Sequence, residues 1–584
     1  MAGMLERFDL GFEIPVAERT PVVEALLRVI EALRASLAEE REKSQRLQLR
    51  VDALTEEVNR LKGLPDKPQR PRQPSSLNDP RGKPSENVPQ ESPGTSSAGG
   101  AAGESAQKKL PMGSDGKRAG SAKRSKTREI AIHHTVPLTL SGLPEGTVAC
   151  GTRKFVVQDL RIEAVNTCYE RQRYHLPNGE YETAALPDDV RSHFGPTLQG
   201  YALYQHHHNQ VTQPLLLEEL REFGIDISAG QIDRLLTAGH ERFHEEKDRL
   251  LPTAREVSSY LQTDDTSAKH CGKAGHTLQI GNEFFTSFTT SETKSRVNFL
   301  KVLLEPFREY TLNHDTLTYL KAHAVPDWVC ALATAATGQV LTGDSAWDAQ
   351  LAAWQITKAE SRRLLTEAAL WASLQQHELY TDIVFLSDDA KQFQVQGFLH
   401  ALCWLHAERH VAGLIPLTDT QRAAHLLARD EIWTFYQRLK QYRLTPTDAE
   451  KTVLNTEFDR LFQQSTGWSE VDAALRKILA RKERLLLVLT HPEIPLHNNL
   501  SENDIRQYVK KRKISAGTRS DLGRRCRDTF LSLKTTCRKL RQSFWQYLSD
   551  RLQTVAKIPS LATLIRQQAT HPPPKIPRPH CALI

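Results

Sequence analysis

The chain has 584 residues, a formal net charge of +7 at pH 7, 39% hydrophobic residues and 25% charged residues. This length is too great for one hydrophobic core and predicts about three or four folded units. No run of about 18 apolar residues occurs, so no membrane-spanning helix is expected, and the N-terminus lacks the apolar core of a secretory signal. The eight cysteines stand singly without a CxxC pair, which gives no support to a disulfide framework and favours a reducing cytoplasm.

Residues 1–63 carry a heptad pattern. Apolar positions alternate at intervals of four and three, at Leu26, Ile30, Leu33, Leu37, Leu47, Val51, Leu54, Val58 and Leu61. Glu40 and Ser44 occupy core positions in the middle, an interruption that two-stranded seams tolerate. The pattern predicts a coiled coil over residues 22–62 that serves self-association as a dimer. A helix that folds back on its own chain is the alternative.

Residues 64–129 differ in composition from the rest. They are rich in Pro, Ser, Gly, Lys and Gln and almost lack aromatic residues, so they cannot bury enough apolar surface to offset the entropy of ordering. We expect a disordered polar linker, whose basic end at 117–128 suits nonspecific contact with DNA.

Residues 130–200 mix short β-like runs, at 154–158 and 161–165, with a Pro-Asn-Gly turn. They predict a small β-rich module. Cys150 and Cys168 are too few to hold zinc by themselves, so we expect a degenerate zinc-binding-like module and regard zinc as doubtful.

Residues 201–250 predict a helix-turn-helix-like DNA-binding region. Gly224 separates two helices, and Ser228 with Gln231 forms a capping box at the start of the second. An ordinary helical hairpin has the same pattern and is the alternative. The histidines at 206–208 are adjacent and diverge around a helix, so we expect an exposed cluster rather than a metal site.

Two pairs of acids follow β-like runs. The stretch EVSSYLQTDDTSAKH predicts a strand that ends at Asp264 and Asp265, and DIVFLSDDAKQF predicts one that ends at Asp388 and Asp389. Between them HTLQIGN and EFFTSFTTS predict two strands joined by a Gly-Asn turn. Open α/β sheets bind ligands at the ends of such strands, although a turn or a helix cap explains either pair alone.

The stretch HNNLSENDIRQYVKKRK places Glu502 ahead of five cations, Arg506, Lys510, Lys511, Arg512 and Lys513. From Arg506 to Arg541 thirteen Lys or Arg and two Asp give a balance of +11, so the rest of the chain is slightly acidic. A basic block of this kind indicates a phosphate-bearing partner, and we favour nucleic acid over a solvated charged face.

A metal explains why an acid stands in so basic a surface. Asp264, Asp388 and Glu502 would together hold two divalent ions about 4 Å apart. Mg²⁺, or Mn²⁺, suits hard oxygen ligands and a phosphate substrate. The cations that follow Glu502 would then hold the DNA backbone that enters the site.

Five stretches together resemble the large (TnpC-type) transposase of the insertion sequence 66 family, a DDE transposase. They are TDDT at 263–266, SDDAKQF at 387–393, ALCWLHAERH at 401–410, NNLSENDIR at 498–506 and the basic segment 512–548. The resemblance implies an α/β fold with a ribonuclease-H-like catalytic domain over 251–548, with helical insertions at about 305–380 and 410–490, followed by a tail over 549–584. It also implies a bacterial, nucleoid-associated enzyme with helper proteins encoded by the same element.

By motif position, the family's catalytic triad corresponds to Asp264, Asp388 and Glu502, with Asp265 and Asp389 ranked second. The resemblance implies metal-dependent DNA strand cleavage and strand transfer at the ends of an insertion sequence. Asn498 and Asn499 would orient Glu502 or contact phosphate, and Arg506, Lys510, Lys511, Arg512 and Lys513 would bind double-stranded DNA.

Some features leave alternatives open. The gap of 124 residues between Asp264 and Asp388 exceeds the family pattern, and the family's Asp-Glu-Thr is Asp-Asp-Thr here. Cys403 and His406 have a spacing that suits metal binding, but we expect them to pack beside the second acid. A catalytically silent DNA-binding protein and a metal-dependent nuclease without joining activity are the rival functions.

Overall fold

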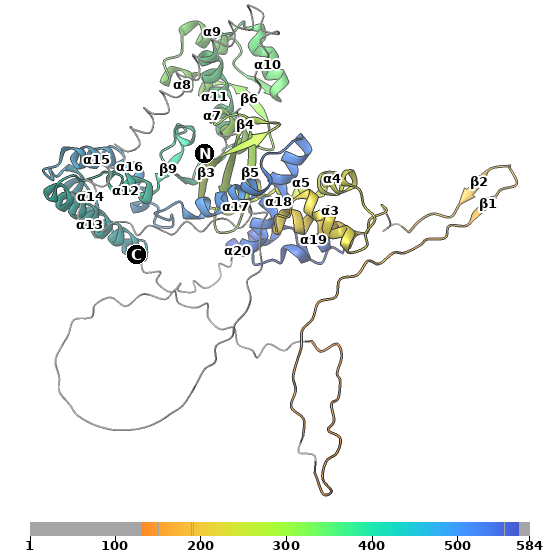
Figure 1. Cartoon of the computed structure of the whole chain (residues 1–584). Coiled ribbons are helices and arrows are strands. Elements are labelled where there is room, and N and C mark those ends of the chain that lie inside the picture. Colours follow the sequence, from red (N-terminus) through yellow and green to blue (C-terminus); the bar gives the residue numbers. More distant parts are fainter. Residues whose placement is uncertain (1–130, 149–150, 188–189, 191, 554, 571–584) are drawn as a thin grey trace, which may run out of the picture. The chain divides into compact units, whose positions relative to one another are not determined.

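A computed structural model of the chain describes residues 131–148, 151–187, 190, 192–553 and 555–570 (Figure 1). The coiled coil predicted over 22–62 and the linker predicted over 64–129 lie outside these residues. Among the described helices, none is long and apolar enough to cross a membrane.

By its internal contacts the chain divides into two units, Lys67–Arg161 and the remainder, whose described part begins at Ile162. The described residues of the first unit form neither helix nor strand, and they are exposed. The strands predicted at 154–158 and 161–165 are not formed, so this prediction is wrong. Strand formation depends on packing against neighbouring strands and a core, and these residues have neither.

The second unit begins with a short antiparallel hairpin. Strands β1 (Arg173–His175) and β2 (Tyr181–Thr183) pair across the predicted Pro-Asn-Gly turn. Gly179 closes this turn with a φ of 88°, a conformation that favours glycine.

A helical module follows and contains the predicted pair of helices. Its elements are α2 (Pro196–Leu203), the π-helix η2 (Tyr204–His208), α3 (Gln213–Glu222), α4 (Ala229–Thr237), α5 (Glu241–Asp248) and α6 (Leu250–Val257). Gly224 breaks the chain between α3 and α4 with a φ of 81°. The capping box is confirmed, because the Ser228 side chain accepts from the Gln231 main chain and the Gln231 side chain accepts from the Ser228 main chain.

The histidines at 206–208 do not form the exposed cluster that the sequence predicts. His207 is 3% exposed, and its ring stacks on that of Phe530 with centroids 4.4 Å apart. Two lysines reach the main-chain carbonyls at this end of the helix: Lys511 donates to His206 at 2.7 Å, and Lys534 donates to His208 at 3.1 Å. The two ammonium groups therefore satisfy carbonyls at the end of the helix that would otherwise be buried without a hydrogen bond.

A mixed five-stranded sheet forms the centre of the unit and confirms an α/β fold. Its strands are β3 (Tyr260–His270), β4 (Lys273–Gly281), β5 (Thr286–Ser291), β8 (Val384–Ser387) and β9 (Leu399–Leu402), in the order β5-β4-β3-β8-β9. The first three strands run antiparallel, whereas β3, β8 and β9 run parallel.

One strand end differs from its prediction. β8 ends at Ser387, just before Asp388, as predicted. β3, however, continues past Asp264 and Asp265 to His270, because these residues pair with β4. Only Tyr260, Leu261 and Gln262 pair with β8, so Asp264 lies just beyond the parallel part of the sheet.

Between β5 and β8 lies the first helical region. It contains α7 (Arg296–Leu304), β6 (Glu309–Leu312), α8 (His314–Ala322), α9 (Asp327–Ala335), β7 (Gln339–Thr342), α10 (Asp344–Ala353) and α11 (Ala359–Gln376). Strands β6 and β7 form a separate antiparallel pair. The 3₁₀ turn η3 (Lys391–Phe393) lies between β8 and β9.

A second helical region follows β9 and has its own hydrophobic core. It contains α12 (Trp404–Ala412), α13 (Asp419–Tyr442), α14 (Asp448–Gln463), α15 (Ser469–Leu479), α16 (Lys482–Leu485) and the 3₁₀ turn η4 (Leu487–Leu489). The side chains of β8 alternate between two cores: Phe385 packs in the first, while Val384 and Leu386 pack in the second.

The chain returns to the sheet in its last helices, α17 (Asn499–Ser515), α18 (Asp521–Lys539), α19 (Phe544–Leu552) and α20 (Leu561–Thr570). Helix α18 covers the edge strand β5 (Figure 1). Three main-chain N–H groups of the edge donate to α18 side chains one turn apart: Thr286 to Thr536 at 3.1 Å, Phe288 to Ser532 at 2.8 Å and Thr290 to Asp528 at 2.7 Å. These bonds satisfy main-chain N–H groups of β5. On an uncovered edge strand such groups would be unpaired and could pair with a strand of another molecule.

Candidate active site

Asp264 lies on the face of the sheet that α17 covers. It is directly opposite Gln279 in the β3–β4 register, and opposite residues of an antiparallel pair share one face. The Gln279 amide donates to Asp504 of α17 at 3.3 Å. The alternation of side chains along β3 therefore directs Asp264 towards the helix that carries Glu502.

The ionisation of Asp264 is coupled to the other two predicted catalytic acids. Burial, together with the charges of Asp388, Asp265 and Glu502, raises the pKa of Asp264 to about 7, against one hydrogen bond from the Asp265 main chain that lowers it. Like charges that interact in this way disfavour ionisation of all members at once. A cation between them would remove this penalty.

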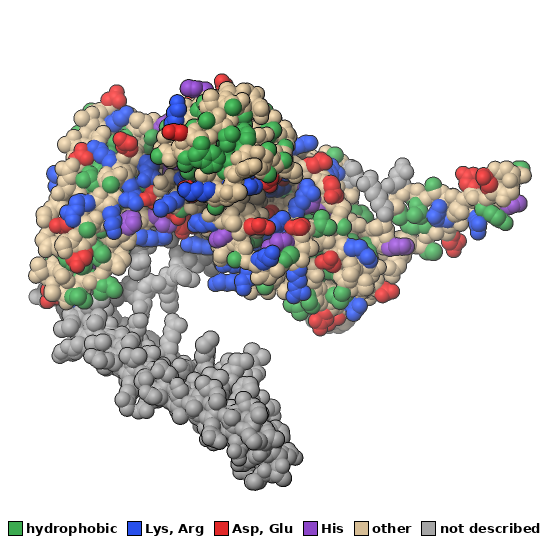
Figure 2. Space-filling model, turned by 90° about the horizontal axis from the view of Figure 1, so that it is seen from above, with side chains coloured by type: hydrophobic (Ala, Val, Ile, Leu, Met, Phe, Trp, Pro, Cys, Tyr) green, Lys and Arg blue, Asp and Glu red, His purple; other side chains and the backbone are tan. Residues whose placement is uncertain are grey.

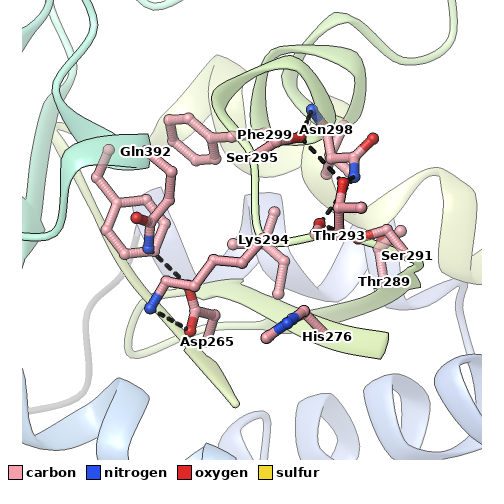
Figure 3. Close-up of a pocket in the computed structure, with 13 residues that line it drawn as sticks. Asp265, His276, Thr289, Ser291, Thr293, Lys294, Ser295, Asn298, Phe299 and Gln392 are labelled. Carbon is pink, nitrogen blue, oxygen red and sulfur yellow. Dashed lines mark hydrogen bonds and ion pairs between the residues drawn. The ribbon is translucent and has the colours of Figure 1, made fainter. Parts of the chain in front are cut away.

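Asp265 points to the opposite face, where a small cavity of about 30 Å³ lies against α7 (Figure 3). Its carboxylate forms an ion pair with Lys294 at 2.9 Å and accepts from Gln392 at 2.6 Å. Figure 3 shows both partners converging on Asp265. The contacts tie β3 to η3, the turn that follows Asp388, so Asp265 has a structural role in this arrangement.

The second acidic pair divides in the same way. Asp388 accepts a hydrogen bond from the Ala390 main chain at 3.2 Å, and no cation among the described residues forms an ion pair with it. Asp389 instead pairs with Arg481 and with Arg484, the latter at 2.9 Å. These arginines lie beside α15 and on α16, so Asp389 holds the second helical region to the strand end.

Glu502 lies in the first turn of α17. One of its carboxylate oxygens, Oε1, is buried and accepts no hydrogen bond among the described residues. Two cationic side chains and one histidine approach the carboxylate without bonding to it: Arg409 at 3.8 Å, Arg506 at 3.7 Å and His406 at 3.9 Å. Burial lowers the pKa of His406, which favours its neutral form. The contact between Glu502 and Arg506, one helical turn apart, is therefore loose.

Two anchors hold α17 over the sheet. At its start, the Asn498 amide donates to the main-chain carbonyl of Thr263 at 2.9 Å. One turn later, the buried Asp504 binds Lys539 of α18 at 2.6 Å and Thr286 of β5 at 2.6 Å. Glu502 lies between these anchors, so its main chain is held against the strand of Asp264.

The residues predicted to bind DNA have different surroundings. Asn498 is 1% exposed and is committed to Thr263, which fits orientation of α17, and Asn499 is half-buried beside it. Lys511 is also 1% exposed, beneath η2. Arg512 bonds to Ser267 of β3. The remaining predicted cations are on the exposed side of α17: Arg506, Lys510 and Lys513.

Helix α12 contributes residues whose importance the sequence understated. Cys403 and His406 lie beside the second acid, as expected: the Cys403 main chain donates to the Ser387 carbonyl at 3.0 Å, and the charge of Asp388 acts on the pKa of His406. The Cys403 sulfur also accepts from the Asn498 main chain at 3.3 Å. The sequence signals for this helix are the spacing of Cys403 and His406 and the family-like stretch ALCWLHAERH. Arg409, 58% exposed and beside Glu502, lies in that stretch, but no feature of its own marks it as a site residue.

The donor set suits a hard divalent cation. Two aspartates and a glutamate supply oxygen ligands, and the unsatisfied Glu502 Oε1 and the raised pKa of Asp264 are relieved by positive charge. Among the described residues, no three His, Cys, Asp or Glu side chains already stand close enough together to hold a metal ion. The carboxylates therefore interact electrostatically here without forming a closed cage.

The chain is similar to known proteins over a range that includes part of this site. A model of the Transposase IS66 family matches residues 366–525, a range that includes Asp388 and Glu502. The uncharacterised protein y4jO of Sinorhizobium fredii (strain NBRC 101917 / NGR234) is 40% identical over 313 residues, which are 53% of this chain and 97% of that protein. Both the site and these similarities point to a DNA-processing enzyme. The chain belongs to the IS66 transposase family, which confirms the resemblance found in the sequence.

Proposed function

We propose that the chain is a DNA transposase that cleaves and rejoins DNA strands with divalent metal ions, and that Asp264, Asp388 and Glu502 are its catalytic carboxylates. The observation that carries the proposal is the placement of Asp264 on the sheet face that α17 covers, where the charges of Asp388 and Glu502 contribute to its raised pKa. The mixed sheet, with acids on and after neighbouring parallel strands, supports the ribonuclease-H-like assignment.

In this proposal each carboxylate holds metal. When bound, a pair of Mg²⁺ or Mn²⁺ ions supplies the Lewis acidity that activates an attacking hydroxyl and stabilises a leaving oxygen. Asn498 keeps the start of α17 on β3, so Glu502 is positioned before DNA arrives. Asp265 and Asp389 keep the two strand segments in place through their own ion pairs.

Double-stranded DNA would lie along exposed cations beside the acids. Arg409 is 58% exposed and Arg506 is 67% exposed, and both flank Glu502. Lys510 and Lys513 continue the exposed side of α17. Figure 2 shows Lys and Arg side chains gathered in a band across the middle of the face that it presents. Phosphate contacts from such a band would position DNA without reading its sequence. The proposal includes self-association through the coiled coil predicted over 22–62.

The test uses the full-length chain, a supercoiled plasmid and pre-cut DNA ends, with MgCl₂ or EDTA. Asp264→Asn, Asp388→Asn and Glu502→Gln should each abolish nicking and joining while DNA binding persists. Asp265→Asn and Asp389→Asn are matched controls, because each makes the same chemical change at the next residue. They should still nick and join DNA, with activity reduced no further than their loss of stability explains.

The results separate the rival functions. Retained cleavage in all three catalytic variants would remove the proposal. Salt-sensitive binding without metal-dependent nicking would indicate a silent DNA-binding protein. Nicking without joining would indicate a nuclease.

A further inference from the structure

A larger cavity lies between the helical module and α19 and includes none of the candidate catalytic acids. Its volume is about 530 Å³, within the range of small-molecule sites. Residues from α2, α4, α5 and α19 line it, together with the segment before α2. No Asp or Glu side chain is among the described lining residues.

Two arginines give the cavity a positive rim. Arg234 of α4 and Arg242 of α5 are both exposed, and neither has an ion-pair partner among the described residues. Arg242 is oriented by one hydrogen bond, from its guanidinium to the main-chain carbonyl of Arg551 at 2.9 Å. Its other N–H groups are available to an anion, and guanidinium groups suit phosphate.

A buried histidine supplies a hydrogen-bond acceptor, whereas the two arginines supply donors. His240 lines the cavity and is 4% exposed. Its Nε2 lies 3.0 Å from the Leu235 carbonyl, so Nε2 carries the proton and Nδ1 is a bare acceptor. This Nδ1 is itself buried, and no group among the described residues donates to it. Burial lowers the pKa of His240, which keeps the ring neutral near pH 7.

The cavity also has an aromatic wall. Phe194 and Phe243 both line it, the first half-buried and the second buried. Guanidinium groups for a phosphate, aromatic side chains for a base and an unpaired acceptor for an N–H or O–H donor together match the chemistry of one nucleotide.

We propose that this cavity binds a single nucleotide unit, its phosphate at Arg234 and Arg242 and its base or sugar donor at His240. The assignment of that nucleotide to DNA, rather than to free nucleotide, rests on the proposed function. Arg234, Gln231 and Leu235 lie on α4, the second helix of the helix-turn-helix-like pair, so DNA that contacts α4 would present an unstacked nucleotide to the cavity. Unstacking a base costs a few kcal/mol, which binding of this kind offsets.

The experiment measures binding of deoxyadenosine 5′-monophosphate to the full-length chain in EDTA, with deoxyadenosine and inorganic phosphate as partial probes. The mononucleotide should bind more tightly than either part. Arg234→Ala and Arg242→Ala should each weaken it by about tenfold or more, the value of a charge-assisted hydrogen bond. Arg249→Ala is the matched control, since Arg249 is exposed on the same module and does not line the cavity.

His240→Phe should weaken the mononucleotide and deoxyadenosine alike but leave inorganic phosphate unchanged, and a thermal melt shows whether this buried variant folds. No saturable mononucleotide binding, or binding that both arginine variants retain, overturns the inference. Competition by a short oligonucleotide assigns the nucleotide to DNA. Binding without competition assigns the site to free nucleotides and overturns the DNA source.

The use of EDTA separates this inference from the proposed function. Asp264→Asn should bind the mononucleotide like the unmodified chain. If the arginine variants bind normally while Asp264→Asn abolishes cleavage, only the inference fails. If the mononucleotide binds as expected while the acid variants still cleave, only the proposed function fails.

Discussion

The side-chain amide of Asn498 donates a hydrogen bond to the main-chain carbonyl of Thr263, 2.9 Å away. This one bond joins the start of α17 to the strand residue that precedes Asp264. It therefore sets the position of Glu502, one turn into α17, relative to the first acid, although the two lie more than two hundred residues apart in the chain.

Asn498→Ala should weaken both stability and activity. The Thr263 carbonyl would lose a buried partner, which costs about 1–3 kcal/mol of unfolding free energy. Urea unfolding measures this loss, and plasmid nicking should fall further than the loss of folded protein explains. Asn455→Ala, an exposed change on α14, is the control and should alter neither quantity. Unchanged nicking in a destabilised Asn498→Ala would show that the bond does not position Glu502.

Asp264→Asn should change how stability depends on pH. The folded pKa of Asp264 is about 7, above the unfolded value of about 3.9. Between these values the folded state holds a proton that the unfolded state releases, so the carboxyl makes stability fall as pH rises through this window. Without metal, the variant should gain about 1–3 kcal/mol relative to the unmodified chain between pH 4 and pH 8.

Urea unfolding in EDTA at the two pH values measures this difference. Comparison across pH removes any constant effect of the substitution. An advantage of the variant that shrinks as pH rises would contradict the buried, repelled state of Asp264.

Asp389→Asn should destabilise the chain without affecting metal binding. Arg481 and Arg484 would lose a shared carboxylate that is one quarter exposed, so we expect a loss of about 1–2 kcal/mol in thermal or urea unfolding. Asp419→Asn breaks the pair of Asp419 with Arg422, whose acid is 93% exposed, and should cost less than about 1 kcal/mol. Equal costs would argue against a structural role for Asp389.

Ser532→Ala should destabilise the edge of the sheet at β5, because it removes one of the side chains of α18 that bind this edge. The Phe288 N–H would lose its acceptor while remaining buried, at a cost of about 1–3 kcal/mol. Hydrogen exchange should accelerate at Phe288 and less at strand β3. Ser469→Ala, exposed at the start of α15, is the control. Unchanged protection of Phe288 would mean that the edge does not need the hydroxyl.

Features with local causes could be predicted from the sequence. The capping box of Ser228 and Gln231, the break at Gly224 and the end of β8 before Asp388 depend on neighbours within a few residues. The Glu502–Arg506 contact follows from helical spacing alone.

Features that depend on residues far apart in the chain could not be predicted from the sequence. Alternation along a strand says that Asp264 and Asp265 face opposite ways, but only the packing of α17 says which face holds Glu502. Acids are unfavourable inside strands, and pairing with β4 overrode this preference when β3 continued to His270. Lys511 belongs to a run of cations that predicts contact with DNA, yet it is buried and donates to the main-chain carbonyl of His206.

Titration of Mn²⁺ into the full-length chain, followed by the electron paramagnetic resonance signal of the free ion, tests the central claim most directly. The account predicts that the chain binds about two ions, that Asp264→Asn, Asp388→Asn and Glu502→Gln each weaken this binding strongly, and that Asp265→Asn leaves it intact. Binding should also weaken below pH 7, because the metal must displace the proton of Asp264. Undiminished binding in all three acid variants would contradict the account.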